Sequence, residues 1–214
     1  MKVDSDLTRE FRNFLLEKGA DLVGFGSVNR LEGAPEIMRP QRYLPDVVSM
    51  ISIGLHINES VCDLIRRSIV TRRRPPSYHS FQMFTLGIIN PQLDMLAYLG
   101  AKFLEDRGYR AYPFHANIPH ILKPTKEYPG GLGDISHKHV AVACGLGDIG
   151  WYNLLITPKY GVRQKLTAIV TNAPLEADPI LERKMCNPEV CGFKCAFACP
   201  TNPIPRSIEK EGVN

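Results

Sequence analysis

Residues 143–150 read Ala-Cys-Gly-Leu-Gly-Asp-Ile-Gly, a glycine-rich stretch around which the rest of the chain is interpreted. Its glycines satisfy the G-x-G-x-x-G pattern of a dinucleotide-binding turn. However, Pro158 follows Gly150 after eight residues, which leaves no room for the long crossover helix that such a turn needs. Nor do residues 170–172 contain the acidic residue that would bind a ribose. The stretch therefore does not predict a nicotinamide site, and its glycines suit either a bulky flat ligand or a structural turn.

Outward from this stretch, the hydrophobic pattern alternates between helical and strand periods. Helical spacing, with an interruption at Pro91, predicts helices at residues 7–18, 59–69, 78–89, 92–107 and 139–144. Apolar and β-branched runs predict strands at residues 22–25, 47–55, 109–114 and 165–171. Proline and glycine predict connections at residues 33–45 and 118–134. This alternation predicts an α/β (α+β) layered domain over residues 1–178 and a separate short segment over residues 179–214.

The composition is that of a globular protein of modest charge. The chain has 214 residues, of which 44% are hydrophobic, and a formal net charge of +4. This charge falls well short of a concentrated basic surface, so we do not expect a nucleic-acid partner. No run approaches the roughly 18 apolar residues of a membrane-spanning helix, and the first residues are charged rather than an apolar signal. We therefore expect a cytoplasmic protein without a membrane partner.

Four of the six cysteines lie close together, in the spacing Cys186-x4-Cys191-x3-Cys195-x3-Cys199-Pro200. Thiols from one short loop can converge on a single centre, and clustered cysteines outside a disulfide framework are typical of metal sites. A run that ends in x3-Cys-Pro is typical of bacterial iron–sulfur sites, whereas structural zinc usually takes ligand pairs from separate loops. We therefore predict a [4Fe-4S] cluster on these four thiols, with zinc or an unoccupied structural set as alternatives.

The other two cysteines, Cys62 and Cys144, stand alone in apolar surroundings. A free cysteine in such surroundings behaves as a small hydrophobic residue. Both are expected to be buried structural thiols.

With these motifs in view, the chain resembles epoxyqueuosine reductases and corrinoid-dependent reductive dehalogenases. The resemblance is carried by ACGLGDIG at 143–150, LLITPKYG at 154–161, VTNAPL at 170–175 and Cys-Pro-Thr at 199–201. Residues 43–45, 49–55 and 104–113 are similar in style, so the resemblance covers most of the chain. It implies a nitroreductase-like α/β domain that binds a cobalamin-type corrinoid, and a ferredoxin-like C-terminal segment whose cluster relays electrons.

The resemblance also implies where the partners of this chain would bind. The corrinoid would lie against the glycine-rich region, where the expected contacts are Gly145, Leu146, Gly147, Gly150, Thr157 and Tyr160. A ferredoxin or flavodoxin would reduce the cluster, and a small molecule would be the substrate. The chain could also pair as a homodimer.

Several positions depart from the pattern of the family. Trp151 and Tyr152 stand where epoxyqueuosine reductases have Lys-Asn, while Asp148 resembles the acidic residue that dehalogenases place there. The chain has no twin-arginine export signal of the kind that many dehalogenases carry. The catalytic aspartate of the tRNA-modifying enzymes lies upstream of the glycines, where this chain has Asp134.

Asp134, Tyr78 and His137 are the candidate catalytic residues. A carboxyl, a phenol or an imidazole can donate a proton to a carbanion or to a product bound to cobalt. His79 and His139 have the same chemistry, and a histidine outside any ligand spacing is also commonly a packed or surface residue.

Two functions follow from these observations. The first is an iron–sulfur, corrinoid-dependent oxidoreductase that reductively cleaves a small organic or nucleoside-like substrate. The second is an electron-transfer or regulatory 4Fe-4S protein in which the α/β domain is a docking scaffold without an organic cofactor. Bound cobalt distinguishes the first from the second.

Overall fold

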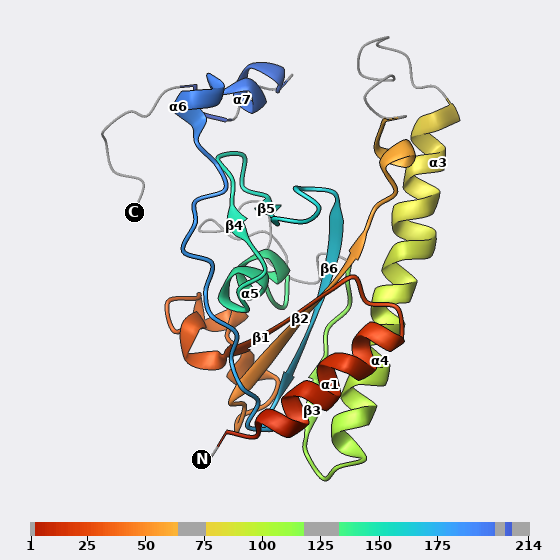
Figure 1. Ribbon diagram of the computed structural model, residues 1–214, viewed down its shortest axis with the longest axis vertical. Coiled ribbons are helices and arrows are strands. Elements are labelled where there is room, and N and C mark those ends of the chain that lie inside the picture. Colours follow the sequence, from red (N-terminus) through yellow and green to blue (C-terminus); the bar gives the residue numbers. More distant parts are fainter. Residues whose placement is uncertain (1–2, 64–75, 118–132, 200–203, 207–214) are drawn as a thin grey trace.

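The computed structural model describes residues 3–63, 76–117, 133–199 and 204–206, and its centre is a four-stranded sheet (Figure 1). The strand order is β1-β2-β6-β3, and every neighbouring pair is antiparallel. The strands are β1 (Leu22–Ser27), β2 (Ser49–His56), β3 (Ala111–Pro113) and β6 (Gln164–Thr171). All four were expected from the sequence, with bounds that differ by a few residues.

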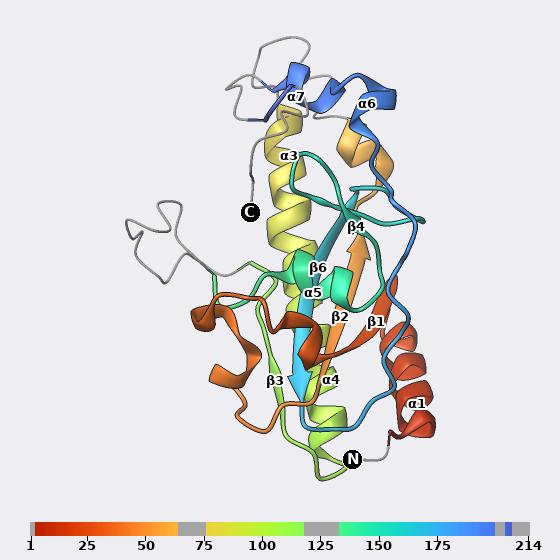
Figure 2. The ribbon, with the colours of Figure 1, turned by 90° about the vertical axis from the view of Figure 1, so that its left-hand side faces the viewer.

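Helices cover both faces of this sheet, which gives a mixed α/β fold in layers. Helices α1 (Ser5–Glu17) and α4 (Asn90–Glu105) pack on one face. Helix α5 (His137–Ala143) packs on the other face, against β1, β2 and β6 (Figure 2). The first core cluster lies under α1 and α4, and the second lies under α5.

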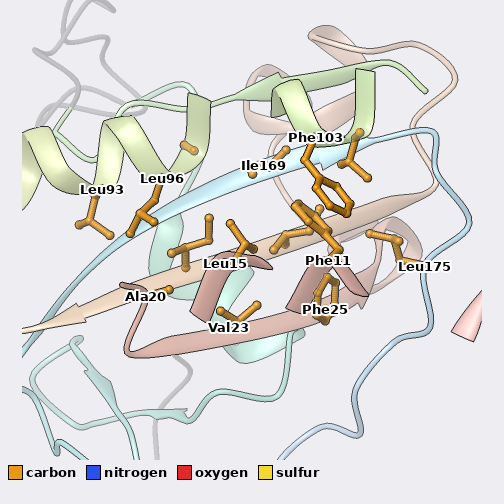
Figure 3. Close-up of a cluster of buried hydrophobic side chains, with 14 of the residues drawn as sticks. Phe11, Leu15, Ala20, Val23, Phe25, Leu93, Leu96, Phe103, Ile169 and Leu175 are labelled. Atoms are coloured by element: carbon orange, nitrogen blue, oxygen red, sulfur yellow. The ribbon is translucent and has the colours of Figure 1, made fainter. Parts of the chain in front are cut away.

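Alternation along the strands fills both cores. In β2, Ile51 and Ile53 point toward α1 and α4, while Met50 belongs to the core under α5. Successive side chains of a strand point to opposite faces, so a strand buried on both sides is apolar throughout. In Figure 3, Phe11 of α1 lies against Phe103 of α4, and their rings stack with centroids 5.0 Å apart. Each such fully buried side chain contributes about 1.5–3 kcal/mol.

Helix α1 begins and ends at residues whose chemistry favours those positions. The Asp4 carboxylate accepts the backbone N–H of Leu7 at 2.9 Å, which satisfies one of the free donors of the first turn. Gly19 follows the helix with φ of 102°, a backbone conformation that glycine adopts readily. Between these ends, Phe11 and Leu15 share one buried face at helical spacing.

The expected interruption at Pro91 is wrong. Helix α3 (Pro76–Phe84), a π-helical turn η4 (Thr85–Ile89) and α4 follow one another without a break, as one long helix in Figure 1. In the π turn the N–H of Asn90 bonds to the carbonyl of Thr85, five residues back. Proline cannot donate the next backbone bond, and the wider turn that precedes it lets the helix continue.

Two glycines of β1 allow α5 to lie close to the sheet. A Cβ on Gly24 would stand 2.5 Å from the Cys144 carbonyl oxygen, and one on Gly26 would stand 2.7 Å from that of Ala143. Such separations are too short for any side chain. The end of α5, where the glycine-rich stretch begins, is therefore fixed against the edge of the sheet.

The remaining expectations fall partly outside the described residues. The connection predicted at 33–45 contains short 3₁₀ turns, η1 (Val28–Leu31), η2 (Glu36–Met38) and η3 (Pro40–Arg42). Residues 59–63 are helical as expected. Residues 64–69 and most of the predicted loop at 118–134 lie outside the residues that the structure describes. The helices that the structure describes are too short or too polar to cross a membrane.

A substitution at Gly100 tests the packing of α4 on the sheet. A Cβ at this position would stand 2.6 Å from the Ile169 Cδ1 atom and 3.2 Å from the Leu15 Cδ2 atom. We expect Gly100→Ala to lower the free energy of unfolding by about 1–2 kcal/mol, because overpacking outweighs the better helix propensity of alanine. Chemical denaturation measures this change.

Gly87→Ala is the matched control on the same long helix. Its Cβ would meet only the Met83 Cε atom, at 3.7 Å. It should leave the free energy of unfolding unchanged or slightly raised. Equal effects of the two substitutions would contradict the packing that we describe.

Candidate functional site

The four clustered cysteines lie at one end of the molecule, in what we call the cysteine segment (residues 184–199). Two short helices form it, α6 (Pro188–Cys191) and α7 (Lys194–Ala198), beyond the hairpin β4–β5 in Figures 1 and 2. That hairpin consists of β4 (Asp148–Ile149) and β5 (Leu155–Ile156). None of the four thiols forms a disulfide and all are half-buried; they belong to Cys186, Cys191, Cys195 and Cys199.

The reversal between α6 and α7 requires an unusual backbone. Gly192 and Phe193 both have left-handed conformations, with φ of 64° and 54°. Glycine adopts this conformation readily, whereas a residue with a side chain pays about 1–2 kcal/mol. Phe193 stands between Cys191 and Cys195, so the strain falls at the centre of the cysteine segment. Backbone strain of this kind is concentrated at functional sites.

The glycine-rich stretch anchors the start of the cysteine segment. The Asp148 carboxylate accepts the backbone N–H of Met185 at 3.3 Å and lies 3.5 Å from the Lys184 ammonium. The backbone N–H of Trp151 points to the Cys186 sulfur at 3.4 Å. Asp148, which resembles the acidic residue of the dehalogenases, is thus an anchor just ahead of the first cysteine.

The Trp151 side chain makes two more contacts at this end of the molecule. Its ring meets the Phe193 ring edge to face, with centroids 5.6 Å apart and planes inclined at 74°. Its indole N–H donates to the Pro205 carbonyl at 2.7 Å. Trp151 therefore contacts the chain before, within and after the cysteine segment's two helices.

The chemistry of the four thiols fits an iron–sulfur cluster. None of them forms a disulfide and all are half-buried. Burial, and then the charges of Cys186 and Cys195, raise the pKa of Tyr152. Within the described residues, however, no three cysteine, histidine or carboxylate side chains gather closely enough to hold a metal ion.

Each glycine of the glycine-rich stretch is needed for contacts within the chain. A Cβ on Gly145, whose φ is 74°, would stand 2.2 Å from the Pro179 carbonyl oxygen. A Cβ on Gly147 would stand 2.2 Å from the Ile156 carbonyl oxygen, and one on Gly150 would stand 2.8 Å from the Ile156 side chain. Of the two explanations that the sequence leaves open, close packing of the turn accounts for all three glycines.

The other predicted cofactor contacts lie in neighbouring parts of the hairpin. Leu146 packs against β1, with its Cδ2 atom 2.9 Å from where a Cβ of Gly24 would stand. Thr157 is buried, and its hydroxyl accepts the backbone N–H of Tyr160 at 3.2 Å, which closes a loop after β5. The Tyr160 ring stacks on His56 with centroids 4.6 Å apart. Their contact with a cofactor stays a prediction.

An open hollow of about 710 Å³ lies beside the hairpin turn. Apolar residues of the connection 31–38 line one side, while Ser136, Lys138, His139 and Asn153 line the other. The Lys138 ammonium donates to the Asn153 carbonyl at 3.0 Å, and burial lowers the pKa of Lys138. A volume of this size, with an apolar wall and a few polar groups, is typical of sites for small organic ligands.

Asp134, the predicted carboxyl acid, precedes α5 at the edge of this hollow, between Gly133 and Ile135, which line it. Burial, and after it the neighbouring Asp134 carboxylate, raise the pKa of Tyr43 to about 12. The Tyr43 hydroxyl and Asp134 therefore interact at this edge of the hollow.

His137 and Tyr78 are the other two predicted catalytic residues. His137 opens α5, and its Nε2 lies 2.8 Å from the His115 carbonyl oxygen, where an N–H would donate. Among the described residues its buried Nδ1 has no hydrogen-bond partner, and burial lowers the pKa of His137. Tyr78 lies in α3, and its side chain is outside the described part of the chain. Catalytic roles for these residues stay predictions.

Sequence reasoning missed the residues that connect the hollow to the cysteine segment. Trp151, Tyr152 and Asn153 form a three-residue hairpin loop, in which Asn153 is left-handed with φ of 64°. A type I turn followed by a left-handed residue is a common loop of this length, and asparagine tolerates that position well. The signal was an asparagine three residues after Gly150, between two short apolar runs.

Comparison with known proteins identifies relatives of this chain. No protein-family model matches the chain. Tetrachloroethene reductive dehalogenase of Desulfitobacterium hafniense is 35% identical over 129 residues, which are 59% of this chain and 20% of that protein. Epoxyqueuosine reductase of Bacillus subtilis is 27% identical over 167 residues, which are 77% of this chain and 37% of that protein. The chain thus spans only a part of each relative.

Solved structures of both kinds share the fold. Epoxyqueuosine reductase bound to an epoxyqueuosine-modified tRNA stem loop covers 92% of this chain and 52% of its own, with 19% identity and a TM-score of 0.54. A catabolic reductive dehalogenase covers 92% of this chain and 25% of its own, with 16% identity and a TM-score of 0.62. The chain is therefore an epoxyqueuosine reductase/reductive dehalogenase-like protein with their mixed α/β fold.

Gly145→Ala tests whether the glycine-rich turn is needed for folding without any ligand. A Cβ here combines a left-handed backbone with a clash against the Pro179 carbonyl. Gly161→Ala is the control, because its φ is 58° and no atom lies within 4 Å of its Cβ. We expect Gly161→Ala to cost about 1 kcal/mol of unfolding free energy and Gly145→Ala about 2 kcal/mol more. Equal losses in metal-free protein would contradict a structural role.

Thiol labelling tests the division of the six cysteines. The Cys144 thiol is buried, donates to the Met50 carbonyl at 3.5 Å, and has a pKa raised by burial. Cys62 is half-buried, and burial raises its pKa too. In reduced, metal-free protein at neutral pH, a maleimide should label the cysteine segment first, Cys62 more slowly, and Cys144 only on unfolding. Peptide mass mapping measures the order, which early labelling of Cys144 would overturn.

Proposed function

We propose that this chain is an iron–sulfur oxidoreductase, or the redox part of one, that reductively cleaves a small organic or nucleoside-like substrate with a cobalamin-type corrinoid. The observation that carries the proposal is the three-residue loop of the hairpin. Its first residue, Trp151, touches the Cys186 sulfur, and its third, Asn153, lines the hollow. A cluster on one side would thus lie close to a ligand on the other.

The separation across this loop is short. Two consecutive residue steps span at most about 7 Å of extended chain, so the backbone at Trp151 and at Asn153 lies within that reach. Lys138 holds the far end through its bond to the Asn153 carbonyl. The loop is therefore held between the cysteine segment and α5. This suits electron transfer from the cluster to the ligand, because the distance between them stays constant.

Separate sets of residues would hold the iron–sulfur cluster and the organic ligands. Cys186, Cys191, Cys195 and Cys199 would hold a [4Fe-4S] cluster, and the hollow beside Asn153 would take the substrate and border the corrinoid. When bound, the cluster supplies single electrons and the corrinoid supplies a reduced cobalt centre. The apolar connection 31–38 would exclude water from one side of the ligand, while Lys138 and His139 offer polar contacts on the other.

Asp134 is the residue that would deliver a proton. It stands between Gly133 and Ile135, which line the hollow, and it interacts with Tyr43. His139 is a second group at the same surface, with its Nδ1 2.6 Å from the Ser136 hydroxyl. A carboxyl or imidazole placed in this way suits protonation of a carbanion formed by reductive cleavage.

The relatives widen the range of substrates and partners. One solved relative holds a tRNA stem loop, which supports a nucleoside-like substrate and argues against dismissing a nucleic-acid partner on net charge alone. The dehalogenase relatives support a small organic substrate instead. A ferredoxin or flavodoxin is the electron donor that a low-potential cluster of this kind would need.

A second candidate is an electron-transfer or regulatory 4Fe-4S protein without an organic cofactor. The packing of the glycine-rich stretch favours it, because Gly145 and Gly147 contact carbonyl groups of the chain itself rather than leaving space. This protein would contain iron and sulfide but would not retain a corrinoid.

Anaerobic purification followed by metal analysis tests the proposal. We expect about four iron and four sulfide per chain, a brown chromophore, and retention of cobalamin measured by absorption titration. Iron and sulfide without cobalamin retention would favour the second candidate. Stoichiometric zinc without iron would contradict both.

Cysteine variants test the ligand set. Cys186→Ser should bleach or convert the chromophore, because it removes a thiolate ligand that oxygen replaces poorly. Cys62→Ser is the control, since Cys62 lies outside the cysteine segment and should keep the wild-type iron content. An unchanged spectrum in Cys186→Ser would remove that residue from the ligand set.

A further inference from the structure

We infer that Trp151 is a positioning residue that closes the cysteine segment around its cluster. The inference rests on the proposed function and adds a residue to it. Trp151 follows the glycine-rich stretch directly, in the loop between β4 and β5. Its backbone and side chain together reach three separate places at this end of the molecule.

The backbone contact is with the first cysteine. The Trp151 N–H lies 3.4 Å from the Cys186 sulfur, within the range of a hydrogen bond to sulfur. Because this donor belongs to the backbone, every variant at position 151 other than proline retains it. A hydrogen bond to a ligand sulfur also helps to set the potential of an iron–sulfur cluster.

The ring contact is with the strained residue between the second and third cysteines. Phe193 keeps its left-handed backbone at φ of 54°, and its ring packs edge to face on Trp151 at 5.6 Å. An aromatic pair in this geometry is favourable, whereas a left-handed backbone at a residue with a side chain is costly. The pair therefore offsets strain in the link between α6 and α7.

The third contact is with the chain beyond the last cysteine. The indole N–H donates to the Pro205 carbonyl at 2.7 Å, which ties residue 205 back to the hairpin. Cys199 lies between Phe193 and Pro205 in the sequence. Trp151 thereby restrains the segment at Cys186, at Phe193 and after Cys199.

The chain between β6 and the cysteine segment (residues 172–183), which we call the strap, is held in place without Trp151. The Asp178 carboxylate accepts both guanidinium bonds from Arg12, at 2.7 and 2.8 Å, and Asp148 accepts the backbone N–H of Met185. Loss of Trp151 should therefore free the cysteine segment while leaving the main domain folded. This separation makes the role of Trp151 measurable.

The test uses the reconstituted full chain, the single variants Trp151→Ala, Trp151→Phe and Phe193→Gly, the double variant Trp151→Ala/Phe193→Gly, and the control Leu154→Ala. Leu154 lies just after the same loop and is 51% exposed. Iron and sulfide per chain are measured first, then the rate at which an iron chelator bleaches the cluster without oxygen, and finally the electron paramagnetic resonance spectrum of the reduced cluster. Far-UV circular dichroism and a thermal melt confirm that the main domain is intact.

We expect Trp151→Ala to bleach about tenfold faster than the wild type, because it loses both a hydrogen bond and an aromatic contact. Trp151→Phe should bleach about threefold faster, since it keeps the ring contact and loses the donor. Phe193→Gly loses the same ring contact but tolerates the left-handed backbone, so its effect and that of Trp151→Ala should not multiply in the double variant. Leu154→Ala should stay within about twofold of the wild type. The reduced-cluster spectrum should broaden in Trp151→Ala and be restored largely by Trp151→Phe.

The outcomes separate the two claims. A wild-type chain that takes up no iron overturns the proposed function, and the role of Trp151 with it. A wild-type chain that holds a cluster, with bleaching rates and spectra unchanged in the Trp151 variants, overturns the role of Trp151 alone. If Trp151→Ala does not fold, Trp151→Phe and Phe193→Gly still decide, because each removes only one contact.

Discussion

The carboxylate of Asp178 joins three parts of the chain that are distant in sequence. It accepts two bonds from the Arg12 guanidinium of α1 and one from the backbone N–H of Phe25 in β1, at 2.8 Å. Arg30 adds bonds to the carbonyls of Ala143 and Asp178, at 2.7 and 2.8 Å. A half-buried carboxylate with this many donors is held strongly, because charge-assisted bonds are about twice as strong as neutral ones. The strap therefore leaves the sheet at a fixed point and in a fixed direction.

This constraint explains why residue 145 of the glycine-rich stretch is a glycine. Once Arg30 and Asp178 hold the strap against the end of α5, the Pro179 carbonyl lies where a Cβ of residue 145 would stand. The glycines are thus a consequence of how closely the strap, the hairpin and α5 approach one another. Their pattern coincides with that of a nucleotide-binding turn, although the physical cause is different.

The spacing of apolar residues in the sequence predicts much of the fold but little of the candidate site. The strands and α1 were predictable because the spacing of their apolar residues matches burial in the cores on the two faces of the sheet. Phe11 and Leu15 of α1, for example, both lie in the first core cluster. The prediction of a break at Pro91 was wrong because the cost of a proline inside a helix depends on the width of the preceding turn. The local sequence does not reveal that this turn is a π turn. The four cysteines were visible as a cluster, and the family resemblance identified in the sequence agrees with the relatives found. The contacts of Trp151, Tyr43 and Lys138 depend on tertiary approach, and no spacing rule encodes them.

The π turn at residues 85–89 has a consequence for how the long helix is put together. A π turn amounts to one residue more than an α-helix of the same rise would contain, and each residue turns a helix by about 100°. The extra residue therefore sets the rotational phase of α3 relative to α4. Phe81 packs on the first core cluster, and its carbonyl accepts the Thr85 hydroxyl at 2.8 Å, just where that phase changes. The same residues in an uninterrupted α-helix would carry Phe81 away from the core, so this one-residue irregularity decides which side of α3 belongs to the inside of the protein.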